Sequence, residues 1–182
     1  MTAPDMDSPS TASSTFEPNA DELLARNAAY AEAFDDHDLD VAPRRQLAIV
    51  ACMDSRMAIF GILGLQHGDA HVIRNAGGVI TDDVIRSLCV SQRALGTEEV
   101  WIVKHTDCGL LGLDDRQFLD ALEADTGERP GWTPGGFASL EEGVREAVEQ
   151  VRSDPALASS AVRGFIFDVE SGELTEIGSN AR

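Results

Sequence analysis

Four short apolar runs alternate along the chain with segments in which apolar residues recur every three or four positions. The runs are Gln46–Ala51, Ala70–Arg74, Glu99–Val103 and Arg163–Val169. Runs that are apolar at almost every position indicate strands buried on both faces, as in a parallel sheet covered by helices. The sequence therefore predicts an α/β fold, with a mostly parallel sheet of about four core strands flanked by helices.

Helical spacing marks the segments before and between these runs. The predicted helices are Ala20–Phe34, Thr81–Leu95, Asp114–Asp125 and Ser139–Val151. The last of them begins with a capping box, in which Ser139 is followed by Glu142. Cys89 falls on the apolar face of the second helix, which predicts a core position. The apolar stripe of the first helix needs a partner surface, because a stripe of this kind is stable only when covered.

Length and composition favour one globular domain. A chain of 182 residues suits a single core, which we expect over residues 19–178. Residues 1–18 are rich in Ser, Thr, Pro, Ala and Asp and are expected to form a disordered acidic tail. Residues 179–182 are expected to form a short C-terminal tail. Three cysteines cannot all pair internally, so thiols kept reduced in the cytoplasm are expected.

Charge and hydropathy exclude two classes of partner. The formal net charge of −18 disfavours nucleic acid, because binding to phosphates relies on Lys and Arg displacing counterions. No window approaches eighteen consecutive apolar residues, and the start of the sequence lacks the pattern of a secretory signal. We therefore expect no membrane partner and a cytoplasmic location.

Two clusters of reactive residues follow predicted strands. They are Cys52-Met53-Asp54-Ser55-Arg56 and His105-Thr106-Asp107-Cys108-Gly109. Carboxyl ends of parallel strands meet at one edge of a sheet, so we expect Cys52, His105 and Cys108 to lie together. Two thiols and one imidazole suit Zn²⁺ and leave its fourth position open, as in catalytic zinc sites. Taken singly, each of the three is more typical of a buried core residue than of a ligand, but this interpretation becomes much weaker for the three together.

Asp54 and Arg56 stand beside the first thiol. Asp54 could accept a hydrogen bond from a zinc-bound hydroxide while Arg56 holds it, or it could move onto the metal. The first arrangement would activate the site and the second would inhibit it. The sequence leaves both open.

Four motifs together resemble the β-class carbonic anhydrases. They are C-M-D-S-R at 52–56, R-N-A-G-G at 74–78, D-D-V-I-R-S-L at 82–88 and H-T-D-C-G at 105–109. The chain is similar to the compact, archaeal-like branch, which also includes carbonyl sulfide and carbon disulfide hydrolases. The resemblance implies zinc held by Cys52, His105 and Cys108, and a catalytic pair formed by Asp54 and Arg56. It also implies substrate contacts at Gly109, Asn75 and Gly77.

The resemblance further implies an activity and an assembly. The implied activity is zinc-dependent, reversible hydration of CO₂ to bicarbonate through attack by zinc-bound hydroxide, which is the reaction of a lyase. The alternatives are hydrolysis of carbonyl sulfide or carbon disulfide at the same zinc site, and a non-catalytic zinc-binding interaction module. The implied assembly is a homodimer or homotetramer in which the N-terminal helix packs on a partner subunit.

Overall fold

The computed structural model describes residues 18–159 and 161–178. The expected tails at 1–18 and 179–182 therefore lie almost wholly outside the described residues. Within the described part, the chain forms two compact units, which divide between His37 and Asp38. Each unit is described by itself.

The first unit contains helix α1 (Ala20–Glu32), which confirms the predicted N-terminal helix. No residue of α1 is buried, and Leu23, Leu24 and Tyr30 are exposed, Leu24 by 66%. One exposed ion pair, between Arg26 and Glu22, joins successive turns of the helix. The apolar residues of the predicted stripe are thus exposed on the surface of this helix.

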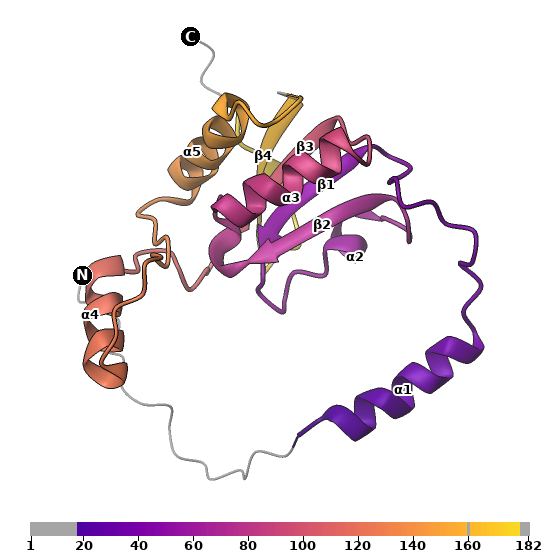
Figure 1. Cartoon of the computed structure of the whole chain (residues 1–182), viewed down its shortest axis with the longest axis horizontal. Helices are drawn as coiled ribbons and strands as arrows, with labels where there is room; N and C mark the ends of the chain where they lie inside the picture. Colours follow the sequence, from indigo (N-terminus) through magenta and orange to yellow (C-terminus); the bar gives the residue numbers. More distant parts are fainter. Residues whose placement is uncertain (1–17, 160, 179–182) are drawn as a thin grey trace. The chain divides into compact units, whose positions relative to one another are not determined.

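The second unit is built on one sheet of five strands among the described residues, in the order β2-β1-β3-β4-β5 (Figure 1). Its strands are β1 (Leu47–Cys52), β2 (Ala70–Asn75), β3 (Glu99–His105), β4 (Ala161–Phe167) and β5 (Leu174–Glu176). The first four are parallel, which confirms the predicted sheet. The short β5 pairs antiparallel with β4 and was not foreseen from the sequence.

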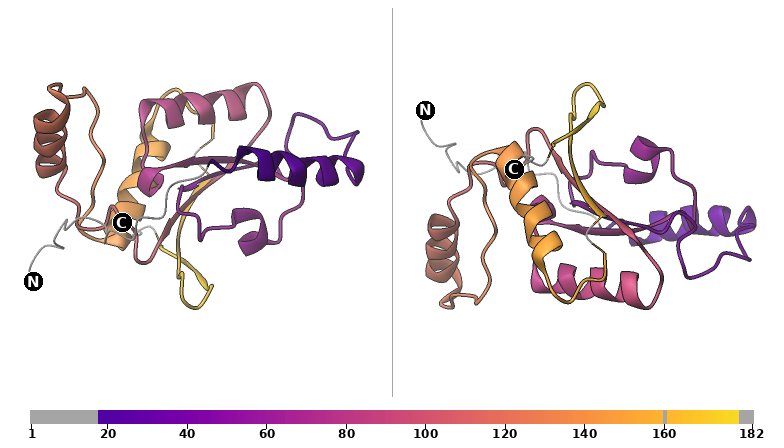
Figure 2. Two further views of the ribbon diagram at one scale, coloured as in Figure 1. Left: turned by 90° about the horizontal axis from the view of Figure 1, so that it is seen from below. Right: turned by 90° about the horizontal axis from the view of Figure 1, so that it is seen from above.

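Helices cover both faces of this sheet, which Figure 2 shows edge-on. The helices of this unit are α2 (Ile59–Leu63), α3 (Asp82–Arg93), α4 (Asp115–Thr126) and α5 (Leu140–Ser153). α3 and α5 lie on one face, and the short α2 lies on the other (Figure 2). Two buried apolar clusters follow from this layering, one on each side of the central strands. No helix within the described residues is both long and apolar enough to cross a membrane.

The polar residues that begin the helices explain where they start. The Thr81 side chain accepts a hydrogen bond from the Val84 amide, and the Ser139 side chain accepts one from the Glu142 amide. These bonds satisfy amides that have no partner within the helix. Cys89 on α3 differs from the prediction of a core position, because it is only half-buried and its thiol donates to the Ala156 carbonyl.

Candidate metal centre

The structure brings together the three residues that the sequence proposed as metal ligands. Cys52 ends β1, His105 ends β3, and Cys108 lies three residues further on in the following turn. One sulfur or nitrogen atom from each lies within 4.8 Å of those of the other two, and all three residues are buried. The parallel register explains this proximity, because β1 and β3 are neighbours whose carboxyl ends reach the same edge.

His105 presents a nitrogen that needs a partner. Its Nδ1 lies 2.8 Å from the Thr106 carbonyl oxygen. A carbonyl can only accept, so Nδ1 carries the proton and donates, and Nε2 is left with a free lone pair. Nε2 is buried and has no hydrogen-bond partner among the described residues, on a side chain that is 0% exposed. A buried acceptor without a partner is unfavourable, and a metal ion would satisfy it.

The electrostatics of the thiols also fit a cation. Burial raises the pKa of the Cys108 thiol, and the nearby Cys52 raises it further, while a hydrogen bond from the Leu110 amide lowers it. Two thiolates close together in a buried site repel each other unless a positive charge lies between them. A divalent cation would remove this repulsion and hold both sulfurs deprotonated. The donor set therefore fits a metal that binds sulfur and nitrogen.

Asp54 and Arg56 form a tightly bonded pair beside this cluster. Arg56 donates to Asp54 Oδ1 from Nε at 2.9 Å and to Oδ2 from Nη2 at 2.8 Å. Its backbone amide also donates to Oδ1, at 2.9 Å. These bonds hold the pKa of Asp54 well below its usual range, and the pKa of Arg56 above its usual range. Asp54 Oδ2 lies 3.7 Å from His105 Nε2, so an ionised carboxylate borders the position that a metal would take.

Two further residues support this pair and were given no role from the sequence. Asp107 binds Arg56 Nη1 through its carboxylate at 2.7 Å and Nη2 through its carbonyl at 3.0 Å. Arg74 donates to the carbonyls of Cys52 at 2.9 Å and Asp54 at 2.6 Å. Asp107 lies inside the motif at 105–109 and Arg74 inside the motif at 74–78. The residues to which they bind, Arg56, Cys52 and Asp54, are distant from them in sequence. Membership of these motifs was the only signal that could have identified them.

The residues expected to contact substrate lie around the same edge of the sheet. Asn75 is the register partner of Cys52, but both polar atoms of its side chain bind the Val79 backbone, at 2.8 and 3.0 Å. Gly77 is buried and, as a glycine, could contact a substrate only through its backbone. Gly109 is exposed, and a Cβ added to it would stand in open space. The amide of Asn75 therefore holds the turn after β2, and its substrate contact stays a prediction, as do those of Gly77 and Gly109.

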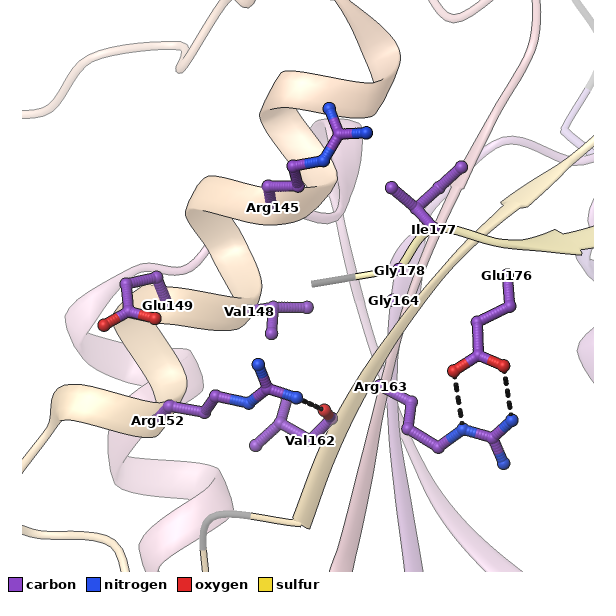
Figure 3. A pocket seen from close by; sticks show the side chains of 10 residues that line it. All are labelled: Arg145, Val148, Glu149, Arg152, Val162, Arg163, Gly164, Glu176, Ile177 and Gly178. Atoms are coloured by element: carbon purple, nitrogen blue, oxygen red, sulfur yellow. Dashed lines mark hydrogen bonds and ion pairs between the residues drawn. The ribbon is translucent and has the colours of Figure 1, made fainter. Parts of the chain in front are cut away.

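A groove of about 800 Å³ lies elsewhere, between α5 and β4 (Figure 3). Three arginines line it, but each already binds an acceptor of this chain. Arg145 pairs with Glu141, Arg163 pairs with Glu176, and Arg152 donates to the Val162 carbonyl. None of the proposed metal ligands lines this groove. The chemistry of the motifs is therefore concentrated at the carboxyl ends of β1 and β3.

Comparison with known proteins agrees with this site. The family model for carbonic anhydrase matches residues 47–127. Beta-carbonic anhydrase 1 of Mycobacterium bovis is 46% identical over 158 residues, which cover 86% of this chain and 96% of that protein. Carbon disulfide hydrolase of Acidianus sp. is 51% identical over 155 residues, with 71% of this chain and 76% of that protein covered.

Solved structures point the same way. The crystal structure of carbonic anhydrase from Streptococcus mutans superposes with a TM-score of 0.84 at 36% identity, covering 90% of this chain and 99% of that chain. Together, these matches show that the chain belongs to the β-carbonic anhydrase family. The resemblance stated from the four motifs is thereby confirmed.

Proposed function

We propose that this chain is a zinc-dependent lyase that interconverts CO₂ and bicarbonate. The observation that carries the proposal is the clustering of one donor atom each from Cys52, His105 and Cys108 within 4.8 Å, with Asp54 beside them. Membership of the β-carbonic anhydrase family and the 46% identity to a β-carbonic anhydrase support it. The same donor set, two thiolates and one neutral imidazole, supports zinc as the metal.

Bound zinc would act as a Lewis acid that lowers the pKa of water in its fourth position. The residues of this chain then orient that water. Asp54 is an acceptor-only carboxylate whose ionised form is stabilised by Arg56, so it could accept a hydrogen bond from this water and orient it. Because Arg56 binds both oxygens of Asp54, the carboxylate is held back from the cluster.

The pocket wall would be formed by the turns that follow the strands. We propose that the Gly109 amide and the turn that contains Asn75 and Gly77 contact the substrate. The open space at Gly109 and its place directly after Cys108 support this role. The bonds from Asn75 to Val79 would keep that turn fixed while substrate enters.

Hydrolysis of carbonyl sulfide or carbon disulfide is the second candidate. The specific observation in its favour is the 51% identity to the Acidianus carbon disulfide hydrolase. Replacing oxygen by sulfur in a linear triatomic substrate changes its size and polarity, while attack at the central carbon is retained. The coverage of 86% by the β-carbonic anhydrase relative, against 71% by the hydrolase, favours CO₂.

One stopped-flow experiment separates these functions. Purified zinc-loaded protein at pH 8.5 is mixed with CO₂ in the presence of a pH indicator, and parallel samples with carbonyl sulfide or carbon disulfide are assayed for H₂S. We expect rapid CO₂ hydration and slow or no release of H₂S. Fast H₂S release without CO₂ hydration would assign the hydrolase, and inactivity towards all three would leave the non-catalytic zinc module.

We also propose that residues 19–178 act as one domain in a cytoplasmic homodimer or homotetramer. The exposed apolar stripe of α1 supports the assembly, since Leu23, Leu24 and Tyr30 would be covered by a second copy. The three free cysteines support a reducing compartment.

Light scattering after size-exclusion chromatography is expected to give a dimer or tetramer, and L24D is expected to shift the mass towards the monomer. A wild-type monomer would contradict this proposal.

A further inference from the structure

Lys104 occupies an unusual position for a lysine. It is the only lysine in the sequence, and it lies on β3 immediately before His105 with 2% of its surface exposed. Burying an ammonium group is unfavourable unless other groups compensate the lost hydration. Burial accordingly lowers the pKa of Lys104, while the attraction of Cys108, Cys52 and Glu146 acts in the opposite direction.

The ammonium group is held by a carbonyl and a ring. Lys104 Nζ donates to the Gly77 carbonyl oxygen at 2.8 Å, and it stands 4.4 Å from the centre of the Phe137 ring. Gly77 is the middle residue of the turn Ala76–Gly78, which follows β2. The single lysine therefore connects the strand that carries His105 to a turn that comes from a different strand.

That turn is packed against the segments that carry both cysteines. A Cβ on Gly78 would lie 3.1 Å from the Cys52 amide nitrogen, and a Cβ on Gly77 would lie 2.6 Å from Leu110 Cδ2. The backbone of Gly77 has a φ of 70° and that of Gly78 a φ of 57°. Glycine adopts such positive angles readily, so it allows the turn to pack this closely against its neighbours. Leu110 in turn donates its amide to the Cys108 sulfur. The contacts thus run from Lys104 through the turn to the backbone of Cys52 and, by way of Leu110, to the sulfur of Cys108.

We propose that Lys104 is a positioning residue of the metal centre, which holds the turn Ala76–Gly78 against Cys52 and Leu110 and so fixes the spacing of the two sulfurs. This inference rests on the proposed metal site but not on which substrate the enzyme uses. A lysine that only fills the core would contribute to folding stability but not to the geometry of the sulfurs. The two roles differ in their effect on metal binding.

The mutational test uses K104M, K104R and a matched control, Q92M. Gln92 is also a buried polar residue that holds a loop, because its side chain accepts a hydrogen bond from the Ala158 amide. It lies on α3, whose buried apolar residues pack in a different cluster from Cys52 and Cys108. K104M keeps the length of the side chain and removes its charge and donors. K104R keeps the positive charge and the hydrogen-bond donors. A cavity of about 270 Å³ that Lys104 lines gives room for the larger guanidinium group.

Zinc affinity is measured by competition with a chelator, and the absorption spectrum of the cobalt-substituted protein reports the geometry of the sulfurs. We expect K104M to bind zinc about tenfold or more weakly and to change the cobalt spectrum, as for other residues that orient ligands. K104R is expected to recover most of the affinity. Q92M is expected to lower the melting temperature and leave affinity and spectrum unchanged. Wild-type affinity and spectrum in folded K104M would overturn the proposal.

A second measurement needs no mutation. Because the chain has one lysine, protein labelled with ¹⁵N-lysine gives a single side-chain ammonium signal. We expect this signal to shift, and its protons to exchange more slowly, when zinc is added to the apoprotein at constant pH. An identical signal in both forms would overturn the proposal even if K104M failed to fold. Loss of CO₂ activity with these zinc-dependent changes intact would count against the proposed function alone.

Discussion

Asp54 places one carboxylate oxygen 3.7 Å from the free Nε2 of His105, while Arg56 binds both oxygens of the same carboxylate. The Asp54 carboxylate therefore lies next to the buried donor atoms, while both of its oxygens are hydrogen-bonded to Arg56. An acid held in this way is suited to orient a water molecule at the centre. It is less suited to serve as a fourth ligand, because moving onto the metal would break its bonds to Arg56.

The first prediction concerns this carboxylate. D54N keeps the shape of the side chain but removes its charge and half of its acceptor capacity. We expect zinc content to stay near one per chain and kcat for CO₂ hydration to fall by up to about a hundredfold, in the range typical of a lost residue that orients groups at a metal site. Metal analysis and stopped-flow kinetics on the same preparation check this. Wild-type turnover in D54N would remove Asp54 from the mechanism.

The second prediction concerns Asp107, which the sequence did not single out. Its carboxylate is 79% exposed and binds Arg56 Nη1, so D107N leaves the bonds between Arg56 and Asp54 in place. Exposed ion pairs contribute little free energy, and we expect kcat to fall only about threefold. D83N, which breaks the exposed pair between Asp83 and Arg86 on α3, is the matched control and should leave kcat unchanged. A loss in D107N as large as that in D54N would contradict this.

The third prediction concerns protons released on metal binding. Burial and the nearby Cys52 raise the pKa of the Cys108 thiol, so the apoprotein keeps this thiol protonated at pH 7. Zinc binding needs the thiolate, and uptake should therefore release protons. Calorimetric titrations in buffers of different ionisation enthalpy measure the number. C108S should bind zinc weakly and release fewer protons, whereas a binding enthalpy independent of the buffer would contradict the assignment of thiolate ligands.

The fourth prediction concerns pH and stability at a site away from the metal centre. The Gln66 amide and then Arg45 lower the pKa of Asp69 from its ordinary value of 3.8. Because the pKa is lowered by folding, ionised Asp69 stabilises the fold above about pH 4, and this contribution disappears as the pH falls through the lowered pKa. D69N should therefore melt at a lower temperature than wild type at pH 7. The difference should shrink at pH 3, and a constant difference would contradict the assignment.

Much of the fold could be predicted because its signals are local. The side-chain bonds at Thr81 and Ser139 fix the starts of α3 and α5, and both residues are recognisable from the sequence. The apolar runs identified β1 to β4, because strands buried on both faces leave little room for polar residues. α2 and β5 were missed because five and three residues are too few to show a period. β5 also depends on pairing with β4, which only the folded chain reveals.

The candidate site also has a part that the sequence could predict and a part that it could not. The residues that carry its chemistry, Cys52, His105 and Cys108, are of types that attract attention in any sequence. The contacts that position them join segments far apart: Arg56 to Asp107 across 51 residues, and Lys104 to Gly77 across 27. No spacing rule connects such pairs, because the register of the parallel sheet brings them together. The half-buried Cys89 shows the same limit, since the period of α3 alone predicted a core position.

X-ray absorption spectroscopy at the zinc edge of the purified, zinc-loaded protein identifies the atoms bound to the metal. We expect a four-coordinate ion with two sulfur neighbours at about 2.3 Å and two nitrogen or oxygen neighbours at about 2.0–2.1 Å. Replacing Cys108 by Ser should remove one of the sulfur neighbours or the zinc itself. A zinc ion without sulfur neighbours, or with four of them, would contradict the assignment of Cys52, His105 and Cys108 as its ligands.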